Sequence, residues 1–185
     1  MTVTLIPESD PELVAAVDAR ATSRHAHHEA GHAVAAVARG GKLIRVSLGH
    51  VDWSVPDESA DIPGETEHSS AYADQPFVTF AGPWAEAMWT VEHEDEVDDL
   101  GEALEYVWME NSDGDTDKYE SRIEMLCALA EMLGFGPVGR VWEGAWLDEL
   151  DVLWPAVCEI AALLIDGKPV THELVLATVD RCQRD

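Results

Sequence analysis

The chain has 185 residues, a length typical of one domain and sufficient to bury a hydrophobic core. Hydrophobic residues make up 46% and charged residues 26%, which is ordinary globular usage and argues against disorder over the whole chain. Eleven Lys and Arg stand against 37 Asp and Glu, so the formal net charge is -26. Because that charge repels phosphate backbones and anionic lipid heads, we expect neither direct nucleic-acid binding nor membrane binding.

The cysteines and the apolar stretches indicate in which cellular compartment we expect the protein. Cys127, Cys158 and Cys182 are odd in number and lack CxxC spacing, so they predict reduced thiols and no cysteine zinc site. The longest apolar stretch, residues 154–165, is too short to cross a bilayer, and residues 1–10 lack the basic flank of a secretion signal. We therefore expect a cytoplasmic protein.

The first part of the chain is Ala-rich, which predicts helix. We expect residues 1–21 to form a lead-in and a short helix, and residues 22–185 to form a single domain. A second helix is predicted over about residues 22–39, because apolar residues recur there at helical spacing and Gly40-Gly41 permits a left-handed C-terminal turn.

The middle of the chain predicts a strand, then a loop or an irregular edge, and then helical segments. Residues 43–51 alternate apolar and polar side chains, which predicts a half-buried strand. Residues 52–70 are acidic and lack sustained periodicity, so they predict a surface loop or an irregular edge. The helical pattern that follows requires Pro76 and Pro83 to lie at helix starts or kinks. The acidic segment 92–105 is typical of a solvated helix face.

The remainder predicts further helices. One is entered through a capping loop near residues 111–117 and is closed by Gly134. Its apolar positions are Ile123, Leu126, Ala130 and Leu133. Residues 138–182 predict helices broken at 166–169, with Thr171 as the cap of the last one.

One motif carries recognisable chemistry. His28-Glu29-Ala30-Gly31-His32 is an HExxH sequence inside a predicted helix. Residues four apart project from the same helix face, so two imidazoles can bind one metal ion while the adjacent glutamate approaches a metal-activated water. Zinc lowers the pKa of such a water toward neutrality, and a carboxylate within reach can take its proton and pass it to the leaving amine. The motif therefore predicts a metallopeptidase.

The same segment allows two less specific interpretations. The histidines cluster here, with His25 and His27 beside the motif, so the helix could instead be a pH-sensitive surface, or the match could be accidental. Gly31 inside a helix costs about 1 kcal/mol relative to alanine. Close approach of a strand or a ligand would explain that cost, which favours a built site.

Several segments together resemble a known family. HHEAGHAVAA resembles the active-site helix of the FtsH-type zinc metallopeptidases, and KLIRVSLGH follows where that family has its edge strand. FAGPWAEAMW is similar to the family's Gly-x-x-Ala-Glu helix, and GDTDKYESRIEML to its Gly-x-x-x-Asp segment. The tail PAVCEIAALLIDGKPVTHELV has the family's closing helix, turn and helix. The resemblance covers about residues 22–182 and implies a mainly helical fold with a small β-sheet, in which a zincin-like active-site helix packs beside a short edge strand.

The resemblance also implies roles for particular residues. His28 and His32 would be zinc ligands, Glu29 the general base, and Asp117 the third ligand of a Zn²⁺ cofactor. Glu86 is the rival third ligand, although the family pattern makes it a carboxylate that orients a histidine through its other ring nitrogen.

Two further aspartates near the third-ligand segment are fallbacks. Asp115 and Asp113 both lie close enough to Asp117 in the sequence to replace it as the third ligand. Their ordinary role would be helix N-capping. No oxyanion-stabilising residue stands out, and His50 and His68 are the candidates.

FtsH-type enzymes join this domain to a membrane anchor and an ATPase module, and neither is recognisable in this sequence. We therefore expect a stand-alone, ATP-independent endopeptidase that cleaves unfolded or extended peptides. The strand near residues 43–49 is the expected place for such a peptide to add to the sheet. If the acidic charge lines the site, cationic peptides should associate faster; if it lies on the opposite face, it serves solubility alone.

The alternative is a different class of protein. A degenerate peptidase fold, or an acidic decoy that occupies a basic nucleic-acid-binding surface of another protein, would also explain the charge of -26. The intact Glu29 argues against this alternative, because a degenerate enzyme has no need of its general base.

Overall fold

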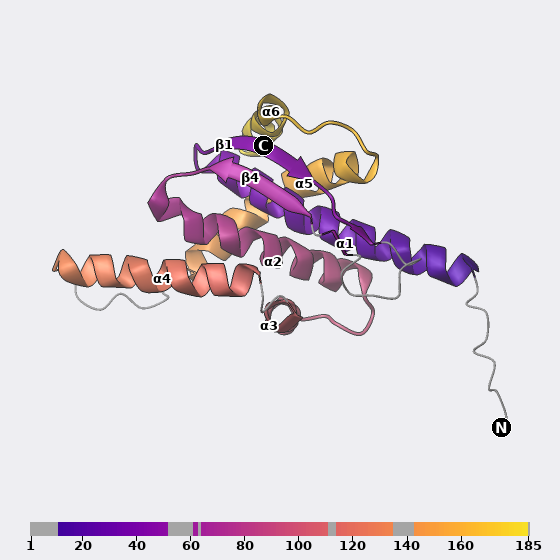
Figure 1. The fold of residues 1–185 in the computed structure, drawn as a ribbon, viewed down its shortest axis with the longest axis horizontal. Helices are drawn as coiled ribbons and strands as arrows, with labels where there is room; N and C mark the ends of the chain where they lie inside the picture. Colours follow the sequence, from indigo (N-terminus) through magenta and orange to yellow (C-terminus); the bar gives the residue numbers. More distant parts are fainter. Residues whose placement is uncertain (1–10, 52–60, 63, 111–113, 135–142, 185) are drawn as a thin grey trace, which may run out of the picture.

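The computed structural model describes residues 11–51, 61–62, 64–110, 114–134 and 143–184, and the fold is mainly helical with a small antiparallel sheet (Figure 1). The helices are α1 (Pro11–Ala38), α2 (Gln75–His93), α3 (Leu100–Glu110), α4 (Asp115–Met132), α5 (Glu143–Ile165) and α6 (His172–Cys182). The strands are β1 (Lys42–Ser47), β2 (His50–Val51), β3 (Asp61–Ile62) and β4 (Glu65–Ser69), and a short 3-10 helix, η2 (Tyr72–Asp74), precedes α2. The expected fold class is thus confirmed.

The first helix differs from its prediction. α1 is one continuous helix of 28 residues, so the interpretation of residues 11–39 as two helical pieces was wrong. Between Pro11 and Gly31 the sequence has no proline or glycine that would break the helix, and alanine, the best helix former, recurs throughout. The predicted end is confirmed, since Gly40 adopts a φ of 73° immediately after the last turn.

The sheet accounts for a second difference between the predicted and the observed structure. β1 pairs with β4 in antiparallel register and β2 pairs with β3, so the strand predicted at 43–51 is confirmed for β1. The prediction of a surface loop or an irregular edge at 52–70 missed the regular strand pairing of β3 and β4, and residues 52–60 are outside the described residues. The half-buried positions of β4 are Thr66 and His68, which are polar. The alternation that marks a strand was therefore hidden, because this face meets the site and not the apolar core.

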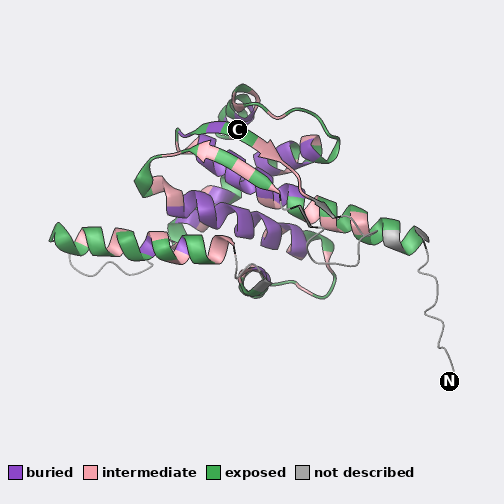
Figure 2. Ribbon diagram, viewed as in Figure 1, coloured by how far each residue is buried: buried purple, intermediate pink, exposed green. Residues whose placement is uncertain are grey.

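The core forms where α1, α2 and α5 meet. α1 and α2 run side by side in opposite directions, and the second half of α1, most of α2 and one face of α5 are buried (Figures 1 and 2). A Cβ atom at Gly31 would lie 2.4 Å from the Ala81 carbonyl oxygen and 2.8 Å from the Ala85 Cβ. The close approach expected at Gly31 is therefore made by another helix, which brings the backbones of α1 and α2 nearly into contact.

The remaining helices mostly follow their patterns. Pro76 lies in the first turn of α2, and Pro83 is inside that helix. Gly167, with a φ of 65°, separates α5 from α6, and the Thr171 side chain accepts a hydrogen bond from the Leu174 amide at 3.3 Å, as its capping role predicts. Among the described residues, no helix combines the length and the apolar character needed to cross a membrane.

Candidate metal centre

Two histidines and one aspartate converge at one point. The Nε2 atoms of His28 and His32 are 3.1 Å apart, and the Oδ2 atom of Asp115 is 2.9 Å from each of them. The histidines come from successive turns of α1 and therefore share one face of that helix. Asp115 is the first residue of α4. Three potential ligand atoms from two distant segments thus meet in a group that could hold a metal ion.

The other nitrogen of each histidine is already engaged. The Nδ1 atom of His32 donates to the Val78 carbonyl oxygen at 2.7 Å, and the Nδ1 atom of His28 donates to Glu86 Oε2 at 2.8 Å. A carbonyl oxygen and an ionised carboxylate only accept hydrogen bonds, so in a neutral ring the hydrogen is on Nδ1. Both Nε2 atoms then present lone pairs to the Asp115 oxygen. Three acceptors this close repel one another unless a proton or a metal cation lies between them.

The donor set fits zinc. Two imidazole nitrogens and one carboxylate oxygen are zinc ligands, and three protein ligands leave a fourth position open for catalysis. Ligands at about 2.0–2.1 Å in a tetrahedron lie about 3.3–3.4 Å from one another. The three observed separations of 2.9, 2.9 and 3.1 Å are a few tenths of an ångström shorter. A small outward movement of the side chains therefore suffices to admit the ion.

The charges around the histidines are strongly coupled. Burial alone would lower the pKa of His28, but its hydrogen bonds to Asp115 and Glu86 outweigh burial and raise that pKa to about 10. Burial opposes ionisation of Asp115, yet the charges of His32 and His28 and their hydrogen bonds hold the Asp115 pKa well below its usual range. The pKa of Glu86 is also lowered against the effect of burial, by His28 and by Arg24, whose Nε atom is 3.2 Å away. Both carboxylates therefore stay ionised at neutral pH, and they favour a positive charge at His28, which a bound metal ion would supply in place of a proton.

The glutamate of the motif is held by the sheet. Glu29 is 8% exposed and lies one residue after His28 on α1. The Thr66 hydroxyl of β4 donates to Glu29 Oε2 at 2.6 Å. A Cβ atom at Gly64 would lie 2.6 Å from Glu29 Oε1, so a larger residue there would displace the carboxylate. The residues that hold Glu29 in place thus come from the segment expected to be a loop.

A glycine of α2 makes room for the imidazoles. A Cβ atom at Gly82 would lie 2.3 Å from His32 Nε2 and 2.9 Å from His28 Nε2. Glu86 is four residues further along the same helix and therefore faces the same way. The Gly-Pro-Trp-Ala-Glu segment thus has a physical role on one face of α2, where a glycine admits the two rings and a glutamate bonds one of them. This position of Glu86, behind His28, is that of the orienting carboxylate in the sequence interpretation.

The third member of the cluster is not the one preferred from sequence. Asp117 is exposed and does not join the histidines, whereas Asp115, named only as a fallback, does. The two residues are separated by about 200° around the helix axis, since each helical residue advances about 100°. Asp113 is outside the described residues. The family segment after the glycine therefore pointed to the first turn of α4, but the aspartate that lies with the histidines is on another face of that turn from Asp117.

The neighbouring histidines have other environments. His27 is buried, its Nδ1 atom donates to the Ser23 carbonyl oxygen at 2.7 Å, and its ring lies 5.6 Å from that of Trp154. Burial lowers the pKa of His27, so it is neutral at physiological pH. His25 is exposed. The pattern of one buried, one exposed and two convergent rings shows that the cluster is not one uniform histidine surface.

The two oxyanion candidates can be placed only in part. The side chain of His50 is outside the described residues. His68 is half-buried on the same face of β4 as Thr66, and its Nδ1 atom is 2.9 Å from the Ser70 hydroxyl. Its pKa is lowered by burial first and then by the charges of His32 and Arg122. His68 is therefore a neutral side chain in the neighbourhood of the cluster.

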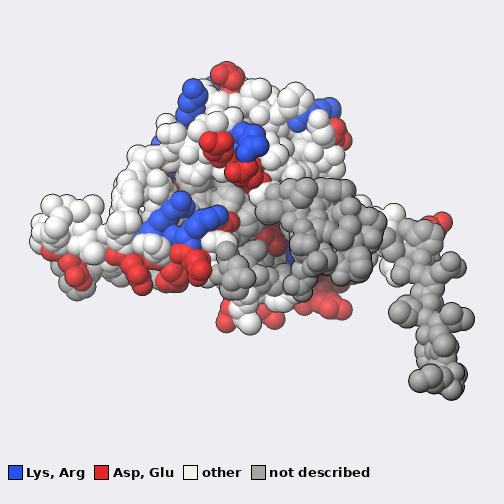
Figure 3. Space-filling view, in the orientation of Figure 1, with Lys and Arg blue, Asp and Glu red and all other residues white. Residues whose placement is uncertain are grey.

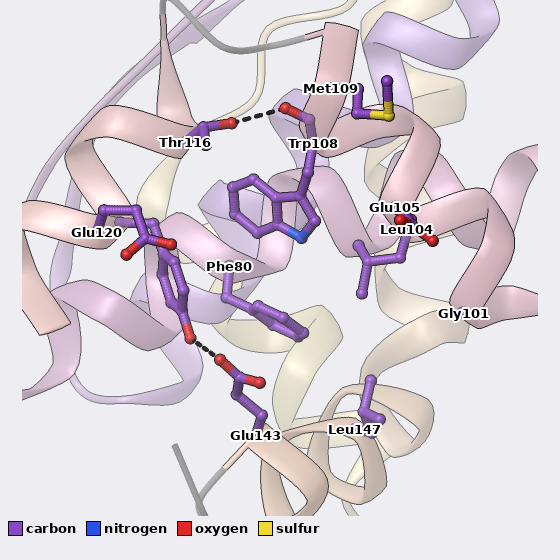
Figure 4. Close-up of a pocket in the computed structure, with 11 residues that line it drawn as sticks. Phe80, Gly101, Leu104, Glu105, Trp108, Met109, Thr116, Glu120, Glu143 and Leu147 are labelled. Carbon is purple, nitrogen blue, oxygen red and sulfur yellow. Dashed lines mark hydrogen bonds between the residues drawn. The ribbon is translucent and has the colours of Figure 1, made fainter. Parts of the chain in front are cut away.

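A separate pocket borders the other side of α4. It has a volume of about 490 Å³ and lies between α2, α3, α4 and α5 (Figure 4). Its described lining includes three aromatic and three acidic residues: Phe80, Trp108, Tyr119, Glu105, Glu120 and Glu143. Tyr119 donates a hydrogen bond to Glu143 across it. His28, His32 and Asp115 are not among these lining residues, so the pocket is a neighbour of the candidate metal centre and not part of it.

No protein-family model matches the chain, and neither a search of curated proteins nor a search of solved structures finds a similar protein. The motif and the geometry of the cluster are therefore the features that bear on function.

Proposed function

We propose that this protein is an ATP-independent zinc metalloendopeptidase of the FtsH type, which cleaves unfolded or extended peptides. The observation that carries the proposal is the convergence of three potential ligand atoms, from His28, His32 and Asp115, within 3.1 Å of one another. Both Nδ1 atoms are already bonded to acceptors behind the rings, so the two Nε2 atoms and the Asp115 oxygen face a single point. That is the arrangement in which histidines bind a metal ion.

The proposed roles follow from the contacts. When bound by these three side chains, zinc supplies a Lewis acid that lowers the pKa of a water toward neutrality. Glu29 takes a proton from the attacking water at its carboxylate and gives it to the nitrogen of the leaving amine, so that one water is added across the peptide bond. Thr66 fixes one carboxylate oxygen of Glu29 for this transfer. Glu86 and the Val78 carbonyl keep the two imidazoles oriented.

The sheet offers a place for the substrate, on a different strand from the one expected. β1 is paired with β4, and on β1 the Leu43 amide donates to His172 Nδ1 at 3.3 Å, so β1 is engaged on both sides. Within the part of the chain that the structure describes, no strand pairs with the second edge of β4. β4 is also the strand that contacts Glu29. An extended peptide added to β4 would therefore lie next to the general base.

Two measurements test the proposal together. Mass spectrometry of the untagged protein is expected to find one zinc per chain, and the zinc-loaded protein is expected to hydrolyse an unfolded protein such as reduced casein. Glu29→Gln is expected to keep zinc and fold but to lose hydrolysis, because an amide cannot take the proton. Glu12→Gln is the matched control, since Glu12 is an exposed glutamate of the same helix and should leave both properties unchanged.

The same experiment addresses the non-catalytic alternative and the role of nucleotide. The sequence has no GxxxxGK[ST] phosphate loop, so added ATP should not change the rate. A zinc-loaded wild type that cleaves no unfolded protein at neutral pH would reject the peptidase and favour an acidic interaction protein. Equal hydrolysis by the wild type and Glu29→Gln would reject the assigned base.

A further inference from the structure

Arg122 is unusual among the basic residues of this acidic chain. Three basic side chains are half-buried in the described part of the structure: Arg24, Arg39 and Arg122. Arg24 pairs with Glu86 at 3.2 Å, and Arg39 pairs with Glu149 at 2.6 Å. Arg122 instead donates to the Thr79 hydroxyl and forms no ion pair with any described carboxylate. Among the described residues, this half-buried guanidinium therefore has no carboxylate at ion-pair distance, and the charge of Asp115, two helical turns away, acts on it from further off.

The position of Arg122 relates it to the metal centre. It follows Asp115 by seven residues on α4, which is two helical turns, so both side chains leave the same face about 10 Å apart along the axis. Its partner Thr79 is the residue after Val78, whose carbonyl holds His32. Lys118 lies between them on α4, with its Nζ atom 3.0 Å from Asp115 Oδ1. Basic side chains accordingly gather over the first half of α4 and the adjoining part of α2 (Figure 3).

The strand β4 borders the site through its contact with Glu29. Thr66 and His68 share the half-buried face of that strand, and Thr66 reaches Glu29. Burial and then the charges of His32 and Arg122 lower the pKa of His68, which places the guanidinium and the β4 face in one electrostatic environment. A peptide added along β4 would lie beside Glu29, and Arg122 is bonded to Thr79, the residue next to the one that holds His32, so the base and the guanidinium both border the same cluster.

We propose that Arg122 binds a carboxylate of the peptide substrate, supplied either by an acidic side chain or by a free C-terminus. This inference rests on the proposed peptidase function. A guanidinium presents a planar fork of donors that matches a carboxylate, and pairing offsets the cost of its partial burial. The net charge of -26 would by itself favour basic peptides. The positive charge of Arg122 acts against it locally and selects acidic peptides.

Peptide binding is the direct test. Fluorescence anisotropy with zinc-loaded Glu29→Gln would measure Kd for matched labelled peptides that carry Glu, Gln or Lys at one position, each as a free acid and as a C-terminal amide. The Glu or the free-acid form is expected to bind about 10-fold more tightly than its uncharged match, as one charge-assisted pair implies. The Glu/Gln arm reports an acidic side chain, and the acid/amide arm reports the C-terminus.

Variants identify the residue responsible. Adding Arg122→Gln should remove that advantage, and adding Arg181→Gln should preserve it, because Arg181 pairs with Glu159 on an exposed surface of α6. Arg122→Lys retains the charge without the fork and should show a smaller preference, which provides a test if the glutamine variant does not fold. Zinc content of each variant is the control for the integrity of the cluster.

These binding measurements distinguish failure of the proposed role of Arg122 from failure of the proposed peptidase function. Equal affinity for all peptides, absence of peptide binding, preference for Lys, or a preference that survives unchanged in Arg122→Gln or Arg122→Lys would each overturn the role of Arg122. If the wild type binds acidic peptides through Arg122 but hydrolyses none, the carboxylate site stands and the peptidase proposal fails.

Discussion

The two pairs of elements that meet at the metal centre are built differently. α1 and α2 are buried against each other, and the small side chains at their contact bring the backbones together. β4 and α4 are each largely exposed on one face, and α4 has only Tyr119 and Ile123 buried along its 18 residues. The first pair supplies both histidines and the groups bonded to their Nδ1 atoms, whereas the second supplies Asp115, the proposed third ligand, and the contacts to Glu29. The site therefore combines a buried half with a half that is largely exposed.

The largest expected effect tests the contribution of α4. Asp115→Asn should weaken zinc binding by at least about 1000-fold, more than the 10–100-fold typical of an outer partner, because a ligand bond is lost. Asp117→Asn is the matched control two residues away on the same helix and should retain zinc. Competition with a chelator of known affinity measures both. Comparable losses in the two variants would show that the face of α4 has been misassigned.

The next effect tests how rigid the α1–α2 half is. Gly82→Ala places a methyl group 2.3 Å from His32 Nε2, so it should reduce zinc affinity about 100-fold and destabilise the protein by about 1–3 kcal/mol. Gly144→Ala is the control, since a Cβ there meets nothing within 4 Å, and it should change stability by no more than about 1 kcal/mol, in the favourable direction. Urea unfolding of the metal-free proteins measures the stability difference. A fully stable, zinc-binding Gly82→Ala would show that the rings can move aside.

A smaller effect is expected at the outer carboxylate of the same half. Glu86→Gln should lower zinc affinity by about 10–100-fold, because the amide no longer holds His28 through a charged acceptor. Glu124→Gln, at an exposed glutamate of α4, should have no effect. The chelator competition used for Asp115 applies here too. A loss equal to that of Asp115→Asn would identify Glu86 as a direct ligand and reverse the two assignments.

The smallest effect concerns β4. Thr66→Val removes the hydroxyl that fixes Glu29 and should reduce kcat about 10-fold, which corresponds to the lower end of the about 1.5–3 kcal/mol that a hydrogen bond to a charged group contributes. Zinc content should be unchanged. Thr66→Ser keeps the hydroxyl and should retain most activity. A rate unchanged by valine would mean that β4 contributes only the peptide-binding edge and not the placement of the base.

The difference between the α1–α2 pair and the β4–α4 pair also determines which parts of the site could be predicted from the sequence. On α1, the spacing of His28 and His32 defines one helix face, so local periodicity was sufficient, whereas on α2 the position of Glu86 came from the resemblance to the family's Gly-x-x-Ala-Glu segment. On α4, Asp115 and Asp117 are equally good candidates until the helix start and its rotation against α1 are known. Thr66 and Gly64 gave no signal, because a strand whose inner face is polar looks like a loop. Arg122 was also missed, since its lack of an ion pair with the described carboxylates is visible only when their positions are known.

The contact of Gly31 with Ala81 and Ala85 has a consequence for recognising this arrangement in other chains. Any side chain larger than hydrogen at residue 31 meets the backbone of the second helix, and bulkier side chains at 81 or 85 would separate the two helices in the same way. The arrangement therefore imposes a two-part pattern: HExGH on one helix, and on the other a small residue and a glycine, followed after two variable positions by alanine and glutamate. The length of chain between the two parts can vary, provided that it still allows the contact between the helices and carries a strand that reaches Glu29 as β4 does.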